Sequence, residues 1–157
     1  MAQSVGSFSD AVINGVVTTQ TGNQLEMVVA ANPTLTIGST TYAITEVFGV
    51  WAIDANDDMA ATGPTQNGWS YNQNYSGTGG IAGWKTTPNN GVTGQTLTFN
   101  YTSFTGTAEN YGYHFRVNGT LPGGGNTGFY KAVPEPTTMV ALGIGALAAL
   151  RRRRSRA

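Results

Sequence analysis

A short acidic segment offers candidate ligands for a metal ion. Asp54, Asn56 and Asp58 place oxygen-bearing side chains at alternate positions, as the start of a calcium-binding loop does. Met59 stands where such a loop needs its turn glycine, and Thr65 stands where a glutamate would complete the coordination. The segment therefore predicts either a loose Ca²⁺ site or a solvated acidic turn that follows a strand ending at Ile53. No other cofactor is expected.

Aromatic side chains within residues 66–84 could form a carbohydrate-binding surface. The candidates are Trp69, Tyr71, Tyr75 and Trp84, which stand among Asn, Gln, Ser and Gly residues. Aromatic faces stack on sugar rings and amides bond to hydroxyl groups, so a carbohydrate-binding module is one interpretation. The alternative is a packed core, because large aromatic side chains supply much of the buried area of a small domain. The spacing favours the core, since Trp69, Tyr71 and Tyr75 would share one face of a strand.

Catalytic groups are sparse, and no enzyme activity is expected. The chain has no cysteine and a single histidine, His114, which we expect to be an exposed structural residue. No Gly-x-Ser-x-Gly, His-Glu-x-x-His or phosphate-loop pattern occurs. A glycosidase would need two carboxylates facing each other, and the positions of Glu26, Glu46 and Glu109 do not predict such a pair.

The elements that must position these residues are strands. Among 157 residues only 10% are charged and 22 are glycine, which favours strands joined by tight turns over helices. Apolar and polar residues alternate in 95–102 and again in 111–118, and we expect these two segments to form a hairpin. Further strands are expected at 11–19, 24–31, 40–53 and 128–133. Residues 1–132 are therefore predicted to form one all-β domain, an antiparallel β-sandwich of jelly-roll or immunoglobulin-like type.

The last 25 residues have a different character. Pro134, Glu135 and Pro136 predict a stiff, extended segment, because proline restricts its own backbone and that of the residue before it. A hydrophobic helix is predicted over 137–150, with an apolar surface formed by Met139, Val140, Leu142, Ile144, Leu147 and Leu150. Such a helix would be about 21 Å long, shorter than the roughly 30 Å hydrocarbon layer of a membrane. It suits a temporary anchor better than a permanent one.

A basic cluster closes the chain and sets its orientation. Arg151, Arg152, Arg153 and Arg154 follow the apolar run directly, and short arginine-rich flanks stay on the cytoplasmic side of a membrane. The preceding domain would then lie on the far side. A nucleic-acid-binding end is the other interpretation of a basic cluster. We expect no nucleic-acid partner, because the apolar run has no polar face and indicates a membrane segment.

The order of motif, apolar run and basic end resembles the PEP-CTERM sorting domain of Gram-negative bacteria that make exopolysaccharide. The resemblance covers the sorting signal at 133–157 and implies that exosortase, a membrane-embedded enzyme, recognises residues 134–136 and removes the tail. It implies an exported protein, held temporarily in the inner membrane and then placed at the cell surface or outside the cell. An association with polysaccharide is also implied by the resemblance. No signal peptide is recognisable after Met1, so we expect one to be encoded upstream of this start.

Overall fold

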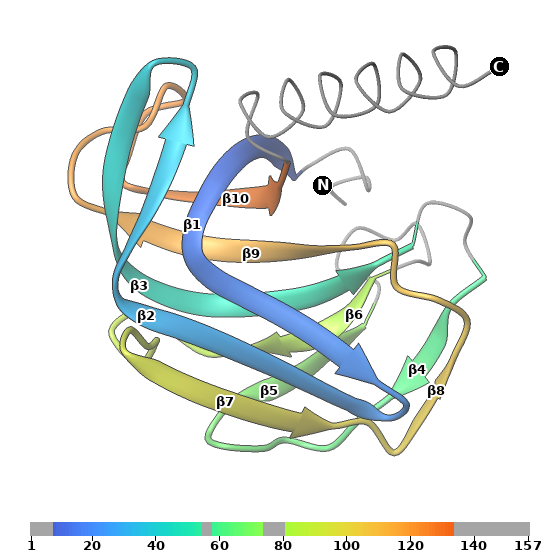
Figure 1. The fold of residues 1–157 in the computed structure, drawn as a ribbon. Helices are drawn as coiled ribbons and strands as arrows, with labels where there is room; N and C mark the ends of the chain where they lie inside the picture. The colour runs from blue at the N-terminus through green and yellow to red at the C-terminus, as the bar shows by residue number, and fades with distance from the viewer. Residues whose placement is uncertain (1–7, 55–57, 74–80, 134–157) are drawn as a thin grey trace, which may run out of the picture.

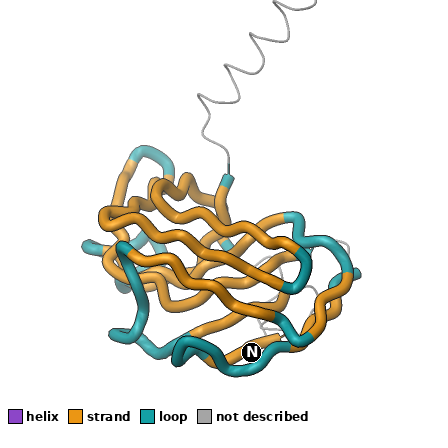
Figure 2. The backbone as a smooth tube through the Cα atoms, turned by 60° about the horizontal axis from the view of Figure 1, so that its bottom comes forward, coloured by secondary structure: helices purple, strands orange, loops and turns teal. Residues whose placement is uncertain are grey.

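The computed structural model describes residues 8–54, 58–73 and 81–133, and every regular element in these ranges is a strand (Figure 1). The strands are β1 (Ser9–Thr21), β2 (Gln24–Ile37), β3 (Thr40–Ile53), β4 (Ala60–Thr62), β5 (Ser70–Gln73), β6 (Ile81–Lys85), β7 (Gln95–Asn100), β8 (Ser103–Thr105), β9 (Asn110–Val117) and β10 (Thr127–Ala132). Figure 2 shows the strands lying side by side, with the loops gathered at the ends of the sheet. The helix predicted at 137–150 lies outside the described residues.

Five strands pair in a closed ring. Strand β3 pairs with β9, β9 with β10, β10 with β1, β1 with β2, and β2 again with β3. All of these pairings are antiparallel except the short one between β1 and β10, in which Ser9 lies opposite Tyr130. The molecule has two walls, one built on β3, β9 and β10 and the other on β1 and β2. Backbone hydrogen bonds join the two walls where β1 pairs with β10 and where β2 pairs with β3.

The sheet folds over at a bulge between β1 and β2. Asn14 pairs with Thr34, but Val16 pairs with Val29, so the four residues 30–33 of β2 lie opposite Gly15 alone. Bulges bend a strand and strengthen its twist, and β1 is sharply curved in Figure 1. Gly15 has a φ of +79°, a conformation that glycine adopts without steric cost. Pro33 fits here because proline cannot donate to a regular ladder.

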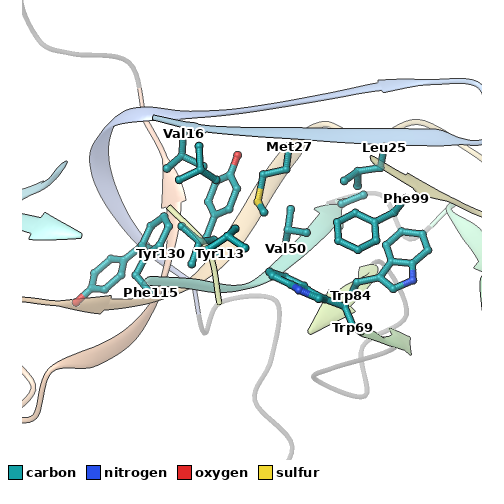
Figure 3. Close-up of a cluster of buried hydrophobic side chains, with 14 of the residues drawn as sticks. Val16, Leu25, Met27, Val50, Trp69, Trp84, Phe99, Tyr113, Phe115 and Tyr130 are labelled. Atoms are coloured by element: carbon teal, nitrogen blue, oxygen red, sulfur yellow. The ribbon is translucent and has the colours of Figure 1, made fainter. Parts of the chain in front are cut away.

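Outside the ring the two walls continue as separate sheets. Strands β6 and β5 extend one wall from β3, and β7 extends the other from β2. The main core lies between the walls, with Leu25 and Met27 from one side facing Val50 and Phe115 from the other (Figure 3). Tyr113 also links the walls, because its hydroxyl donates to Thr18 Oγ1 at 2.8 Å.

Side chains close the free edge of β7. Residues 66–69 form a tight turn in which Asn67 and Gly68 both have positive φ, the geometry that an Asn-Gly turn favours. The Gln66 amide accepts from Asn100 N at 2.9 Å and donates to Asn100 O at 2.7 Å. The Asn67 amide donates to Thr98 O at 2.9 Å. These two side chains occupy backbone groups that an edge strand would otherwise present to solvent.

The prediction of an all-β, mostly antiparallel fold is confirmed. The predicted hairpin between 95–102 and 111–118 is wrong, because β7 pairs with β2 whereas β9 pairs with β3 and β10. The alternation in both segments correctly marks strands with one buried face, but it carries no information on the partner strand. Within the described residues no helix is long and apolar enough to span a membrane.

Candidate functional site

The described chain ends where the Pro-Glu-Pro element begins. Strand β10 is held on both sides, by β9 and by β1. Val133 continues this pairing, since its backbone N–H donates to Ala11 O at 3.0 Å. Pro134 is therefore the next residue after the sheet, and Pro134, Glu135 and Pro136 themselves lie outside the described residues. The domain leaves no spacer between its hydrogen-bonded sheet and this element.

The acidic segment uses its first carboxylate to close a turn. Asp54 is buried, and its Oδ2 accepts from the backbone N–H of Asp58 at 2.6 Å and of Met59 at 2.7 Å. A side-chain hydrogen bond with Asp54, together with the negative charge of that residue, raises the pKa of Asp58 above its ordinary value. Among the residues that the structure describes, no three His, Cys, Asp or Glu side chains gather as metal ligands would. Asn56 lies outside them, so the Ca²⁺ site stays a prediction.

Two of the predicted sugar-binding aromatics are core residues. Trp69 and Trp84 are 2% and 0% exposed, and the Trp84 ring stacks on Phe99 with 4.8 Å between centroids (Figure 3). Tyr71 is half-buried and meets Trp84 edge to face. Because both side chains are almost fully buried, Trp69 and Trp84 cannot stack on a sugar. The core interpretation of these two residues agrees with their burial, and Tyr75 lies outside the described residues.

A cleft on the described surface lies beside these residues and has a volume of about 650 Å³. Phe48 of β3 and His114 of β9 line it. Phe48 is the extra residue of a β-bulge, since Val47 pairs with Phe115 and Gly49 pairs with His114. A bulge redirects the side chain that it carries. Here the Phe48 ring lies against the His114 ring with 3.9 Å between centroids.

His114 is half-buried, so the expectation of an exposed histidine is wrong. Its ring also stacks on Phe129 of β10, with 3.8 Å between centroids. Burial, with a smaller contribution from the positive charge of Lys85, lowers the pKa of His114 to about 4. The imidazole is therefore neutral at neutral pH and offers one N–H donor and one nitrogen acceptor.

One wall of the cleft is a well-anchored loop. Thr86 N donates to Phe48 O at 2.9 Å, and the Asn90 amide donates to Thr87 Oγ1 at 2.7 Å. Behind the loop, the buried Glu46 carboxylate accepts from Gly91 N at 2.7 Å.

Arg116 adds a second support behind this wall. Its Nη1 lies 3.1 Å from Glu46 Oε2 and donates to Asn89 Oδ1 at 2.7 Å. Asn89 has a φ of +75°, which an asparagine tolerates better than most residues. The loop is thus held from β3 and β9, the two strands that also supply Phe48 and His114.

The opposite wall is the turn at 66–69 with the start of β5. Asn67, Gly68 and Ser70 line the cleft from this side, and Lys85 lines it from the end of β6. This cleft was not predicted from the sequence. Its residues are scattered between positions 48 and 114, and the Asn67-Gly68 pair among them is a dipeptide that favours a tight turn.

Comparison with known proteins identifies the tail and leaves the domain without a match. No curated protein and no solved structure matches the chain. Residues 132–154 match the family model of the PEP-CTERM protein-sorting motif, which confirms the resemblance of the tail. The match begins at Ala132, the last residue of β10. The chain thus carries a C-terminal PEP-CTERM protein-sorting motif, which implies an exported protein that exosortase processes at a membrane.

Proposed function

We propose that this protein is a cell-surface or secreted protein whose C-terminal tail is removed by exosortase after export. The match of residues 132–154 to the sorting motif carries this proposal. In it, the predicted helix at 137–150 holds the chain in the inner membrane while Arg151–Arg154 stay on the cytoplasmic side. The β-domain then lies outside, next to the Pro-Glu-Pro element that the enzyme recognises.

The domain fits a role outside the cell without catalysis. It has no cysteine, so its stability in an oxidising compartment depends on sheet pairing and core packing. Residues 1–133 contain seven carboxylates against Lys85, Arg116 and Lys131, so removal of the tail would leave an acidic protein. We further propose that the processed domain resides in an exopolysaccharide matrix as a binding or structural component.

The experiment is a mass measurement on the mature protein. The full gene, including any upstream coding sequence, is expressed with and without exosortase, and the intact mass is determined in each fraction. We expect exosortase to produce a species shortened by the residues that follow the Pro-Glu-Pro element. A variant with Ala at 134, 135 and 136 should keep the full mass, while Lys131→Gln, a change just upstream of the motif, should be processed normally. A full-length chain in the cytosol of both strains would overturn the proposal.

A carbohydrate-binding module remains a second candidate function, but not through the expected aromatic surface. Trp69 and Trp84 are covered by core side chains. The cleft between the turn at 66–69 and the loop at 86–90 supports this candidate instead, because the hydroxyl groups and amides in its lining can bond to hydroxylated ligands.

A further inference from the structure

The cleft between the turn at 66–69 and the loop at 86–90 has the size of a ligand site. Its volume of about 650 Å³ lies within the roughly 300–1,000 Å³ of small-molecule pockets. Another cleft, beside Phe104 and Tyr111, has about 300 Å³. The cleft beside His114 is therefore large enough to hold an organic molecule with several polar groups.

Part of the cleft lining has hydrogen-bonding capacity that the protein does not use. Ser70 and Thr86 contribute hydroxyl groups, and His114 contributes its imidazole. Within the described part of the chain, none of these side-chain groups is hydrogen-bonded to another residue. Each of them can both donate and accept, because the neutral imidazole has one N–H and one bare nitrogen. A matching ligand must therefore carry several groups that both donate and accept, as the hydroxyl groups of a sugar do.

The polar edge of His114 is held in a defined position. Its ring stacks on Phe129 with 3.8 Å between centroids and contacts Phe48 with 3.9 Å between centroids. These contacts restrict rotation of the ring, so its nitrogens are oriented before a ligand arrives. The two aromatic neighbours belong to β10 and β3, the strands on either side of β9.

The two walls of the cleft are also fixed. The Glu46 carboxylate accepts from Gly91 N at 2.7 Å and thereby holds the loop at 86–90 from β3. The Asn67 amide donates to Thr98 O at 2.9 Å and thereby pins the turn at 66–69 to β7. Walls that are already in place favour affinity, because little conformational freedom is lost on binding.

The charges in the cleft favour an uncharged ligand. The described lining contains no Asp or Glu, and burial keeps His114 neutral at neutral pH. Lys85 also lines the cleft, but this lysine already has an interaction partner within the protein. A ligand carboxylate would lose its hydration in the cleft without gaining a free partner of opposite charge, which costs free energy.

We infer that this cleft binds a neutral saccharide, with the Ser70 and Thr86 hydroxyls and the His114 imidazole bonded to its hydroxyl groups. The inference rests on the carbohydrate-binding candidate proposed above and assigns its ligand class and its contact residues. It concerns the folded domain and does not depend on how the tail is processed. Purified protein tests it, so a failure here is distinguishable from a failure of the sorting proposal.

The test is isothermal titration calorimetry on the full-length chain, kept soluble in a detergent without a sugar head group. The neutral probes are maltotriose, cellotriose and mannotriose, and trigalacturonate is the acidic sugar of equal length. We expect at least one neutral trisaccharide to bind, and to bind more tightly than trigalacturonate does.

Variants of the cleft test the assigned contacts. His114→Phe keeps an aromatic ring beside Phe129 but removes both nitrogens, so it should lower the affinity for the neutral sugar about fivefold, as the loss of one hydrogen bond does. Thr86→Val removes a hydroxyl at nearly constant shape and should have a similar effect. Thr96→Val is the matched control, since Thr96 is exposed on β7 and does not line the cleft. It should bind as the wild type does, and urea unfolding should show that all variants are folded.

The possible failures differ from one another. Binding of a neutral sugar that is unchanged in both His114→Phe and Thr86→Val would overturn the assigned contacts and leave the carbohydrate-binding candidate standing. Tighter binding of trigalacturonate than of every neutral probe would overturn the neutral ligand. Absence of binding by all of these sugars at millimolar concentration would overturn both the inference and that candidate, while the sorting proposal would be unaffected.

Discussion

The two sides of this domain are closed in different ways. On one side β1, β2, β3, β9 and β10 form a ring, so the walls are joined there by backbone ladders. On the other side the walls end in separate edge strands, β5 and β7. There, the Gln66 and Asn67 amides cap the β7 edge, and the Trp84 indole donates to Pro64 O at 2.9 Å.

The two sides should therefore differ in how strongly their stability depends on particular residues. Backbone ladders form with almost any side chain, provided that the strands can bend, so the ring depends on a few residues at its corners. The open side depends on the particular side chains that reach across it. Substitutions should therefore be tolerated widely in the ring ladders and poorly at the aromatic core and amide cap of the open side.

The largest effect is expected at Trp84, which fills the core of the open side. Its side chain is fully buried and stacks on Phe99 at 4.8 Å. Trp84→Ala should lower the free energy of unfolding by about 4 kcal/mol, because it leaves a large cavity. Urea unfolding measures the loss. Trp84→Phe should recover part of it, and a loss in Trp84→Ala below about 1 kcal/mol would show that the open side does not depend on this ring.

At the corner of the ring, Gly15→Ala should cost about 2 kcal/mol. The substitution forces a side chain into positive φ, and the new Cβ would lie 3.1 Å from Pro33 Cα and from Ala30 Cβ. Gly22→Ala is the matched control, because Gly22 also has positive φ but has no atom within 4 Å of such a Cβ. Thermal unfolding should show a larger loss at Gly15 than at Gly22. Equal losses would mean that crowding at the bulge is unimportant.

A smaller effect is expected at the amide cap of β7. Gln66→Ala removes two hydrogen bonds to the backbone of Asn100 and should cost about 1 kcal/mol. It also uncovers an edge strand, so self-association should increase in light-scattering measurements. Gln24→Ala serves as the control, since the Gln24 amide reaches only the Asn100 side chain at 3.4 Å. A Gln66→Ala protein that matches Gln24→Ala in both measurements would argue against the cap.

The last effect is absent at neutral pH and appears only in acid. It concerns His114 of β9, whose ring packs against Phe48 and Phe129. Its pKa of about 4 lies below the ordinary 6.5, so the unfolded chain binds a proton here before the folded chain does. Stability should therefore fall as pH drops from 6.5 towards 4. His114→Gln should show a shallower fall over this interval, measured as the unfolding midpoint in urea at each pH. Identical pH profiles for the two proteins would contradict the half-buried, neutral imidazole.

Local patterns predicted the strands well because alternation reflects burial on one face. In 95–102 the apolar residues Leu97, Phe99 and Tyr101 alternate, and β7 covers most of that segment. The strands expected at 11–19 and 24–31 leave only a short connection, and Gly22 lies in it with positive φ. These features depend on residues that are neighbours in the chain, so a short stretch of sequence contains the necessary information.

Partner choice and burial were less predictable. Strands β7 and β9 carry similar patterns but lie in different walls, because long-range pairing with β2 and β3 decides their positions. The residue type of Trp69 does not show whether its side chain lies on a glycan-binding surface or in a core. Only the approach of Phe99, which is 30 positions away in the chain, shows that it is buried.

By itself, the sequence determined the all-β class, the main strand segments and the sorting tail, since each of these depends on residues close together in the chain. The tertiary structure alone decided the closed ring, the burial of Trp84 and the cleft around Lys85 and His114. The physical reason is that the cleft forms only where the bulge at Phe48, the turn at 66–69 and the loop at 86–90 pack side by side. These segments are far apart in the chain, so no local sequence pattern predicts their contact.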